Sequence, residues 1–116
     1  MNKDYTIIES NKELTKVDEY QMILSPAIHS FKDVNGCRII VDKWCIYHTD
    51  GTTVLSIKSK TGEVVSGQST MVRETFQTII ELLDKKEDFE IEFVVERSRK
   101  GRTFCNIALT NAFEDR

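Results

Sequence analysis

Four positive charges lie within six residues near the end of the chain. Arg97, Arg99, Lys100 and Arg102 surround Gly101, with no acidic residue among them. An arginine side chain donates two parallel hydrogen bonds to a phosphate and can also stack on a base. A glycine-containing hairpin with such residues can follow a single nucleic-acid strand. The alternative is a solvated hairpin tip whose charges prevent aggregation, but the pattern favours a phosphate-binding loop.

Aromatic side chains supply the second half of a single-strand site, since stacking on an aromatic ring contributes about 1–3 kcal/mol per base. Phe104 lies two residues after Arg102 of the basic loop, and Trp44 and Tyr47 lie on an earlier β-branched run. Trp44 and Tyr47 differ in strand parity, so no more than one should face outward unless a bulge intervenes, and either could belong to the core. Lys58 alternates with apolar neighbours and should face outward. We include Trp44, Lys58 and Phe104 with the four basic residues as candidate DNA contacts.

The sequence shows no pattern typical of catalysis or of metal binding. The two histidines, His29 and His48, have no Ser/His/Asp or Cys/His arrangement, and no P-loop or GxGxxG motif is present. Cys37, Cys45, His48 and Cys105 are the plausible metal ligands, but no CxxC pair joins them. We therefore predict a protein that is not an enzyme, with no catalytic residue, cofactor or metal.

Six elements must position the basic loop. Alternation and β-branched runs predict strands over 37–48, 53–59, 63–67, 89–96 and 103–109. A helix is predicted over 70–83, because apolar residues recur there at helical spacing: Val72, Phe76, Ile79, Ile80 and Leu83. The order β-β-β-α-β-β is that of the OB-fold, a small Greek-key barrel that often binds oligonucleotides or oligosaccharides.

We accordingly predict a mostly β fold with one helix: an OB-like barrel over 36–109, an N-terminal extension over 1–35 and a short C-terminal tail over 110–116. In an OB-fold, strands 2 and 3 and the loops that join strands 1–2 and 4–5 form the binding groove. Residues 97–102 would be the 4–5 loop, and residues 48–52 the 1–2 loop.

The first 35 residues give the weakest signals. Tyr5 to Ile8 could form a short strand, and residues 11–22 have a weak helical pattern. Pro26 argues against a central strand around it, because proline cannot donate a hydrogen bond to a neighbouring strand. The segment could cap the barrel, form an extra edge strand within the same domain, or mediate oligomerisation, and the residues do not decide among these.

Composition sets the broad class. A chain of 116 residues with 40% hydrophobic residues is long enough for one domain with a core. No signal peptide and no membrane-spanning run is recognisable, and three cysteines are too few for a disulfide framework, which predicts a cytoplasmic protein. A net charge of −3 argues mildly against nucleic-acid binding, but the acids are concentrated over 81–96, directly before the basic loop.

Three stretches resemble the small single-stranded DNA-binding proteins of bacteriophages and of mobile elements in Gram-positive bacteria. They are Thr53–Glu63, Ser66–Thr70 and Ser98–Phe104, and the resemblance covers about residues 36 to 109. It implies an OB-fold protein that coats single-stranded DNA without sequence preference, commonly as a homo-oligomer, in the cytoplasm of a bacterial host. Such a protein supports DNA replication or recombination and has the proteins of those processes as possible partners. A long acidic tail, which the better-known bacterial proteins carry, is not seen in this sequence.

Two other classes of function compete with this one. A protein-interaction module, such as an adaptor to a phage or host replisome, would use the acidic 81–96 face, and a continuous exposed apolar patch beside that face would favour it. A nuclease or other hydrolase would need converging carboxylates and a metal. We rank single-stranded DNA binding first, the interaction module second and the hydrolase third.

Overall fold

The computed structural model describes residues 4–84 and 88–113. Glu87, one of the acids of the 81–96 stretch, and the last three residues of the predicted tail lie outside the described residues. The strands are β1 (Thr6–Ser10), β2 (His29–Ser30), β3 (Arg38–Thr49), β4 (Thr52–Ser59), β5 (Val64–Gly67), β6 (Glu90–Arg97) and β7 (Thr103–Asn111). The helices are α1 (Lys16–Glu19), which continues into a π-helical turn η1 (Tyr20–Leu24), a 3₁₀ turn η2 (Phe31–Asp33), and α2 (Thr70–Leu82).

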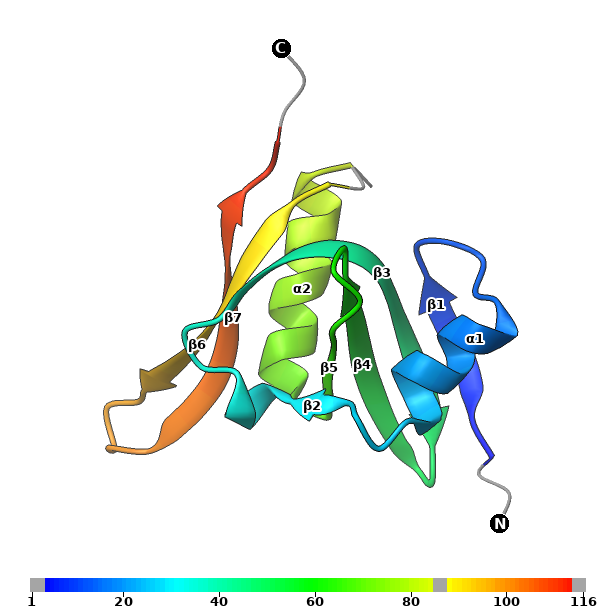
Figure 1. The fold of residues 1–116 in the computed structure, drawn as a ribbon. Helices are drawn as coiled ribbons and strands as arrows, with labels where there is room; N and C mark the ends of the chain where they lie inside the picture. The colour runs from blue at the N-terminus through cyan, green and yellow to red at the C-terminus, as the bar shows by residue number, and fades with distance from the viewer. Residues whose placement is uncertain (1–3, 85–87, 114–116) are drawn as a thin grey trace.

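The strands form one curled sheet in the order β2-β5-β4-β3-β6-β7, with β1 added to the later half of β3. All pairings are antiparallel except the two-residue pairing of β2 with β5. The sheet wraps around α2 as a half-barrel, and the β6–β7 hairpin projects on the side away from β1 and α1 (Figure 1). This confirms a mostly β, barrel-like fold. The expectation of a single helix was incomplete, because α1 and η1 form a second helical segment near the N-terminus.

The predicted elements from residue 37 onward are confirmed to within two residues at each end. Asp50 and Gly51 both have positive φ, 49° and 74°, which is the conformation of the tight turn that an Asp-Gly pair favours between antiparallel strands. Ser69 caps α2, since its side-chain oxygen accepts a hydrogen bond from the backbone N–H of Val72. The apolar stripe of α2 faces the inside of the half-barrel, where Val72, Phe76 and Ile79 are buried.

A bulge in β3 determines which face each of its side chains takes. The β3–β4 register shifts between Val41 and Lys43, and residues on either side of the shift share the inner core although their numbers differ in parity. The side chain of Asn11 hydrogen-bonds the backbone groups at the bulge. Its amide nitrogen donates to Asp42 O at 3.0 Å, and its oxygen accepts from Trp44 N at 2.9 Å. An N-terminal residue therefore completes the backbone hydrogen bonding of the central strand.

Most of the N-terminal segment packs on the outer face of the sheet. A second apolar cluster forms between this segment and β3–β5, with Met22, Cys45, Tyr47, Val54 and Val64 buried at its centre. Phe31, from η2, belongs instead to the inner core, where its ring stacks on Phe93 at 5.8 Å between centroids. Of the three roles left open for this segment, an added edge strand is present as β1, and the remainder covers the sheet.

No helix in residues 4–84 and 88–113 has the length and apolar character needed to cross a membrane.

Candidate nucleic-acid interface

A closed turn presents the basic residues at the end of the β6–β7 hairpin. Ser98 O accepts a hydrogen bond from Gly101 N at 3.0 Å, and Ser98 N donates to Arg102 O at 2.8 Å. Gly101 has a φ of 81°, a conformation that residues with a side chain rarely adopt. Arg99 and Lys100 therefore occupy the tip of a defined turn.

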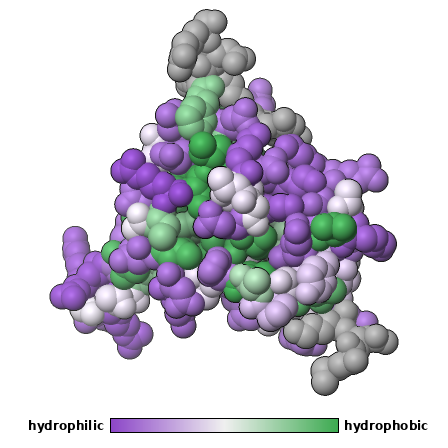
Figure 2. Space-filling model, viewed as in Figure 1, coloured by the Kyte–Doolittle hydropathy of each residue, from purple (hydrophilic) through white to green (hydrophobic). Residues whose placement is uncertain are grey.

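All four predicted basic contacts are exposed. Arg97, Arg99, Lys100 and Arg102 each lie at the surface, and the described part of the chain supplies none of them with an ion-pair partner. Hydrophilic side chains gather at this projecting end, and apolar ones are visible nearer the middle of the same face (Figure 2). The hairpin is thus a cluster of positive charge available to an anionic ligand.

A hollow of about 470 Å³ lies at the base of this hairpin, and pockets that bind small ligands commonly have volumes of about 300–1,000 Å³. It sits where the curled sheet is open, between β7 on one side and the start of α2 and η2 on the other. Its lining combines a cation, two hydroxyls and apolar groups: Lys32, Ser69, Val95, Thr103, Phe104 and Cys105. We call this the seam hollow.

The seam hollow brings together residues that are distant in sequence. Lys32 comes from the N-terminal extension and is exposed, and its contribution was missed because nothing in the sequence of that region indicates where it packs. Val95 continues the alternating strand face of Phe89, Ile91 and Phe93, which are buried, but Val95 itself is 42% exposed. The reason is that the hairpin extends beyond the core, so the end of β6 and the beginning of β7 face the hollow. Phe104, a predicted contact, lines the hollow and is half-buried.

Trp44 and Lys58, the other two predicted contacts, lie elsewhere. Trp44 is 4% exposed, and its ring packs edge-on against Phe76 of α2 at 5.4 Å between centroids. It therefore presents no ring face to a ligand. Lys58 does point to the outer face of β4, as predicted, but the N-terminal segment covers it: its ammonium group lies 2.7 Å from Gln21 Oε1 and 3.4 Å from Asp18 Oδ1. The outer face of β4 and β5, predicted as the groove, is covered by residues of the same chain.

The acidic face over 81–96 is partly neutralised by the chain itself. Glu92 accepts a hydrogen bond from Arg38 at 3.0 Å, and Asp88 pairs with Lys60 at 2.9 Å. The N-terminal helical segment, which carries the exposed residues Val17, Tyr20 and Leu24, lies on the opposite side of the molecule from β6 (Figure 1). Two large apolar side chains within the acidic stretch itself are also exposed, Leu82 at 73% and Val95 at 42%.

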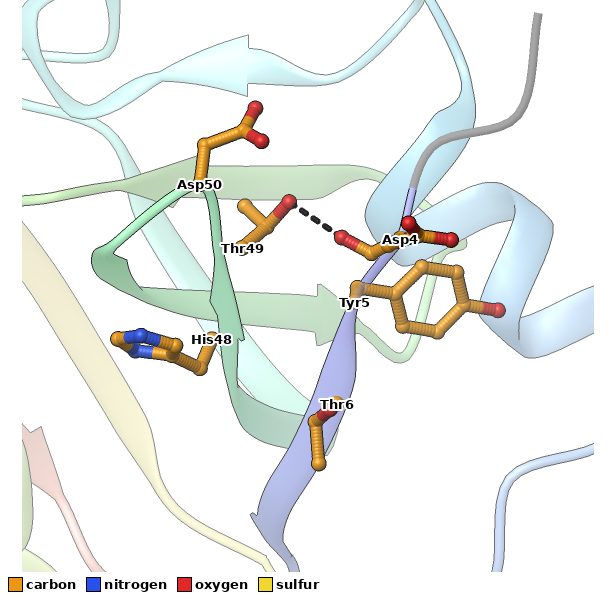
Figure 3. Close-up of a pocket in the computed structure, with 6 residues that line it drawn as sticks. All are labelled: Asp4, Tyr5, Thr6, His48, Thr49 and Asp50. Atoms are coloured by element: carbon orange, nitrogen blue, oxygen red, sulfur yellow. Dashed lines mark hydrogen bonds between the residues drawn. The ribbon is translucent and has the colours of Figure 1, made fainter.

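A second hollow, of about 360 Å³, lies where the β3–β4 turn meets the start of β1 (Figure 3). Thr49 Oγ1 donates to the backbone oxygen of Asp4 at 2.7 Å and ties the turn to β1. The side chains of His48 and Asp50 point in different directions (Figure 3). Among the described residues, no three His, Cys, Asp or Glu side chains are grouped so as to hold a metal ion.

The cysteines differ in chemical accessibility. Cys45 is completely buried under the N-terminal segment, and this burial, assisted by the nearby charge of Glu19, raises the pKa of its thiol to about 12. Cys37 is exposed. We expect a thiol-specific reagent at pH 8 to modify Cys37 in the folded protein and to reach Cys45 after denaturation. Mass spectrometry of the labelled peptides measures this, and fast native labelling of Cys45 would contradict its placement.

Comparisons with protein-family models, with curated proteins and with solved structures found no match for this chain.

Proposed function

We propose that this protein binds single-stranded DNA without sequence specificity, through the β6–β7 hairpin and the seam hollow. One observation carries the proposal: four exposed cations without ion-pair partners in the described chain stand next to a partly apolar hollow, whose rim holds a fifth cation, Lys32. Cations beside an apolar surface match the chemistry of a nucleotide strand, which has charged phosphates and flat apolar bases.

In this mode of binding, the strand's phosphates lie along the hairpin while a base enters the seam hollow. Arg99 and Lys100 at the turn reach outward, so they suit phosphates that run past the tip. Val95 and Phe104 offer an apolar surface on which an unpaired base can rest. A base in a duplex is already stacked and paired, so it gains nothing from this surface, and this difference favours a single strand.

The fold is compatible with the proposal. We further propose that it is an OB-type barrel opened at the seam. In support, the sheet contains the order β5-β4-β3-β6-β7, which matches OB strands 3-2-1-4-5. Along the chain, α2 lies between β5 and β6, the equivalents of OB strands 3 and 4. Pairing of β5 with β7, which would close the barrel, is not found among the described strands. The seam hollow lies at this opening.

The resemblance to phage and mobile-element single-stranded DNA-binding proteins extends the proposal to a biological role. The protein would coat single strands during phage DNA replication or recombination in a bacterial cell, as a homo-oligomer. In this role it needs neither a catalytic residue nor a cofactor.

The test is fluorescence-anisotropy binding of a labelled oligo-dT across a salt series, with duplex DNA as competitor. Four phosphate contacts predict that log K changes with log salt with a slope of about −3, since each contact on a single strand contributes about −0.7. If Lys32 also meets a phosphate, Lys32→Ala reduces the slope by about 0.7. Lys16→Ala is the matched control, because Lys16 is almost fully exposed at the far side of the molecule and should leave the slope unchanged.

Absence of binding at low salt would overturn the proposal, as would equal competition by duplex DNA. Equal effects of Lys32→Ala and Lys16→Ala would remove the seam hollow from the interface while leaving the hairpin in it.

A further inference from the structure

The last strand of the sheet has an edge without the usual protection. β7 spans nine residues, Thr103–Asn111, and contains no Lys, Arg, Asp, Glu or Pro. Proteins commonly protect free strand edges with charges, prolines, bulges or short length, because an unprotected edge pairs with other strands. The edge strand β1 shows such protection: it has five residues, contains Glu9 and is bulged between Ile7 and Glu9.

The hydrogen bonds of β6 establish which groups of β7 are free. Phe93 donates its N–H to Cys37 O at 2.9 Å and accepts from Gly36 N at 2.6 Å, both away from β7. Its opposite residue in the register, Ile107, therefore directs its own N–H and C=O away from β6. The N–H of Ile107 donates to the side-chain oxygen of Asn106 at 2.9 Å. A backbone carbonyl of a partner strand would replace this oxygen as the acceptor. By alternation, the N–H and C=O groups of Cys105 and Leu109 point to the same open edge.

A row of alternating N–H and C=O groups is best satisfied by another polypeptide strand. Within the described chain, β7 pairs with β6 alone and is the last strand of the sheet order. A nucleic-acid strand has no matching row of donors and acceptors, so it is a poor occupant of this edge.

We propose that the occupant is β7 of a second copy, paired antiparallel across a two-fold axis at Ile107. An antiparallel pairing centred at Ile107 aligns all nine residues with residues of the second copy. Position 105 then lies opposite position 109, and position 107 lies opposite position 107. The free N–H and C=O groups of one open edge therefore meet those of the other. Such a two-fold contact must be self-complementary. β7 meets this requirement, because its lack of charge means that no like charges face each other across the axis.

The pairing joins two half-barrels into one continuous sheet. The two Thr103 residues, where the basic hairpins begin, then lie about 27 Å apart along the paired strands, at eight residues of about 3.4 Å each. The hairpins point to opposite ends of the dimer. This arrangement goes beyond nucleic-acid binding by one copy. Because residues 103–105 of the same strand line the seam hollow, the dimer is tested in the absence of nucleic acid.

The test is the oligomeric state of the full chain without nucleic acid, measured by sedimentation equilibrium over a range of concentrations. The wild-type chain should pass from the mass of one chain to the mass of two as its concentration rises. In the proposed register position 106 faces position 108 of the other copy, so Asn106→Lys with Ala108→Lys places lysines opposite lysines. This variant should remain monomeric.

Asn106→Lys with Ala108→Glu is the matched variant. It loses the same Asn106 hydrogen bond but places opposite charges across the axis, so the dimer should return. Circular dichroism and thermal unfolding confirm that both variants fold, since a folding defect caused by the shared Asn106→Lys change appears in both. Hydrogen exchange adds a second readout: the amides of Cys105, Ile107 and Leu109 should become more protected as the wild-type concentration rises.

A wild-type chain that stays monomeric at all concentrations overturns the proposal and leaves the edge to a different polypeptide. A folded Lys/Lys variant that dimerises as well as wild type, or amides of β7 whose exchange is independent of concentration, also overturns it.

Discussion

Replacing Arg97, Arg99, Lys100 and Arg102 together by alanine is expected to weaken oligo-dT binding about 600-fold at 0.1 M salt. The estimate follows from counterion release: each single-strand phosphate contact contributes about 0.7 decades of affinity per decade of salt below 1 M, so four contacts contribute about 2.8 decades. The salt slope should approach zero in this variant. Anisotropy titrations of wild type and variant at several salt concentrations measure both quantities.

The pair Arg99→Ala and Arg102→Ala gives an intermediate result, with an expected loss of about 25-fold at 0.1 M salt from two contacts. Lys16→Glu is the control for overall charge, because it also lowers the net charge by two, at a side chain far from the hairpin. The thermal stability of all three proteins should stay near that of wild type, since exposed loop charges contribute little to folding.

Two results would contradict the hairpin assignment. One is a fourfold variant that is folded and binds as tightly as wild type. The other is a Lys16→Glu variant that loses as much affinity as the Arg99/Arg102 pair, because binding would then respond to net charge and not to the position of the charges.

The order of the elements from residue 37 onward could be predicted because each depends on local rules. The helical stripe of α2, the Asp50-Gly51 turn and the Ser69 cap are signals within a few residues. The basic hairpin is equally local, since both its charges and the turn at Gly101 lie within one stretch. The exposure of these cations followed from the sequence for the same reason.

The placement of the N-terminal third could not be predicted, because it depends on contacts across long sequence separations. Asn11 completes a bulge in β3, more than thirty residues away, and the bulge itself leaves no clear mark in an apolar run. Trp44 and Tyr47 both follow the bulge and take opposite faces of the sheet, and both are buried because each face is covered. Simple alternation allows one of them to face outward, and it does not predict that the N-terminal segment covers the outer face of the sheet.

One short signal in the N-terminal third was nevertheless legible. Thr15 and Asp18 have the spacing of a capping box, in which the first side chain accepts from a later backbone N–H and the second side chain accepts from the first N–H. Both bonds are present, at 3.1 Å and 3.0 Å. The signal indicates where a helix begins but not that the same carboxylate also meets two lysines of the sheet.

That carboxylate links the N-terminal segment to the sheet by charge. Asp18 is buried, with 3% of the residue exposed; its Oδ2 lies 2.6 Å from Lys43 Nζ and its Oδ1 lies 3.4 Å from Lys58 Nζ. Burial alone would raise the pKa of Asp18, but the hydrogen bonds from Lys43 and Thr15 and the charge of Lys43 together lower it well below its ordinary value. The ionised form is therefore the one that the fold stabilises.

Asp18→Asn is expected to lower the free energy of unfolding by about 3 kcal/mol at pH 7. This is the lower end of the effect of removing one partner from a buried ion pair, because Lys43 and Lys58 retain some access to water. Asp42→Asn is the matched control: Asp42 pairs with Lys12 at 2.9 Å, but both side chains are more than a quarter exposed, so the expected loss is below about 1 kcal/mol. Urea unfolding of the three proteins measures these differences.

The loss caused by Asp18→Asn should also depend on pH in a defined direction. Because the pKa of Asp18 is lower in the folded than in the unfolded chain, the unfolded chain takes up this proton first as the pH falls. The stabilisation by Asp18 is fully present above about pH 5 and declines as the pH falls below the unfolded-state value of about 4. Wild type and Asp18→Asn should therefore differ less at pH 3 than at pH 7. An equal difference at both pH values, or a loss no larger than that of Asp42→Asn, would show that the carboxylate does not hold the N-terminal segment to the sheet by its charge.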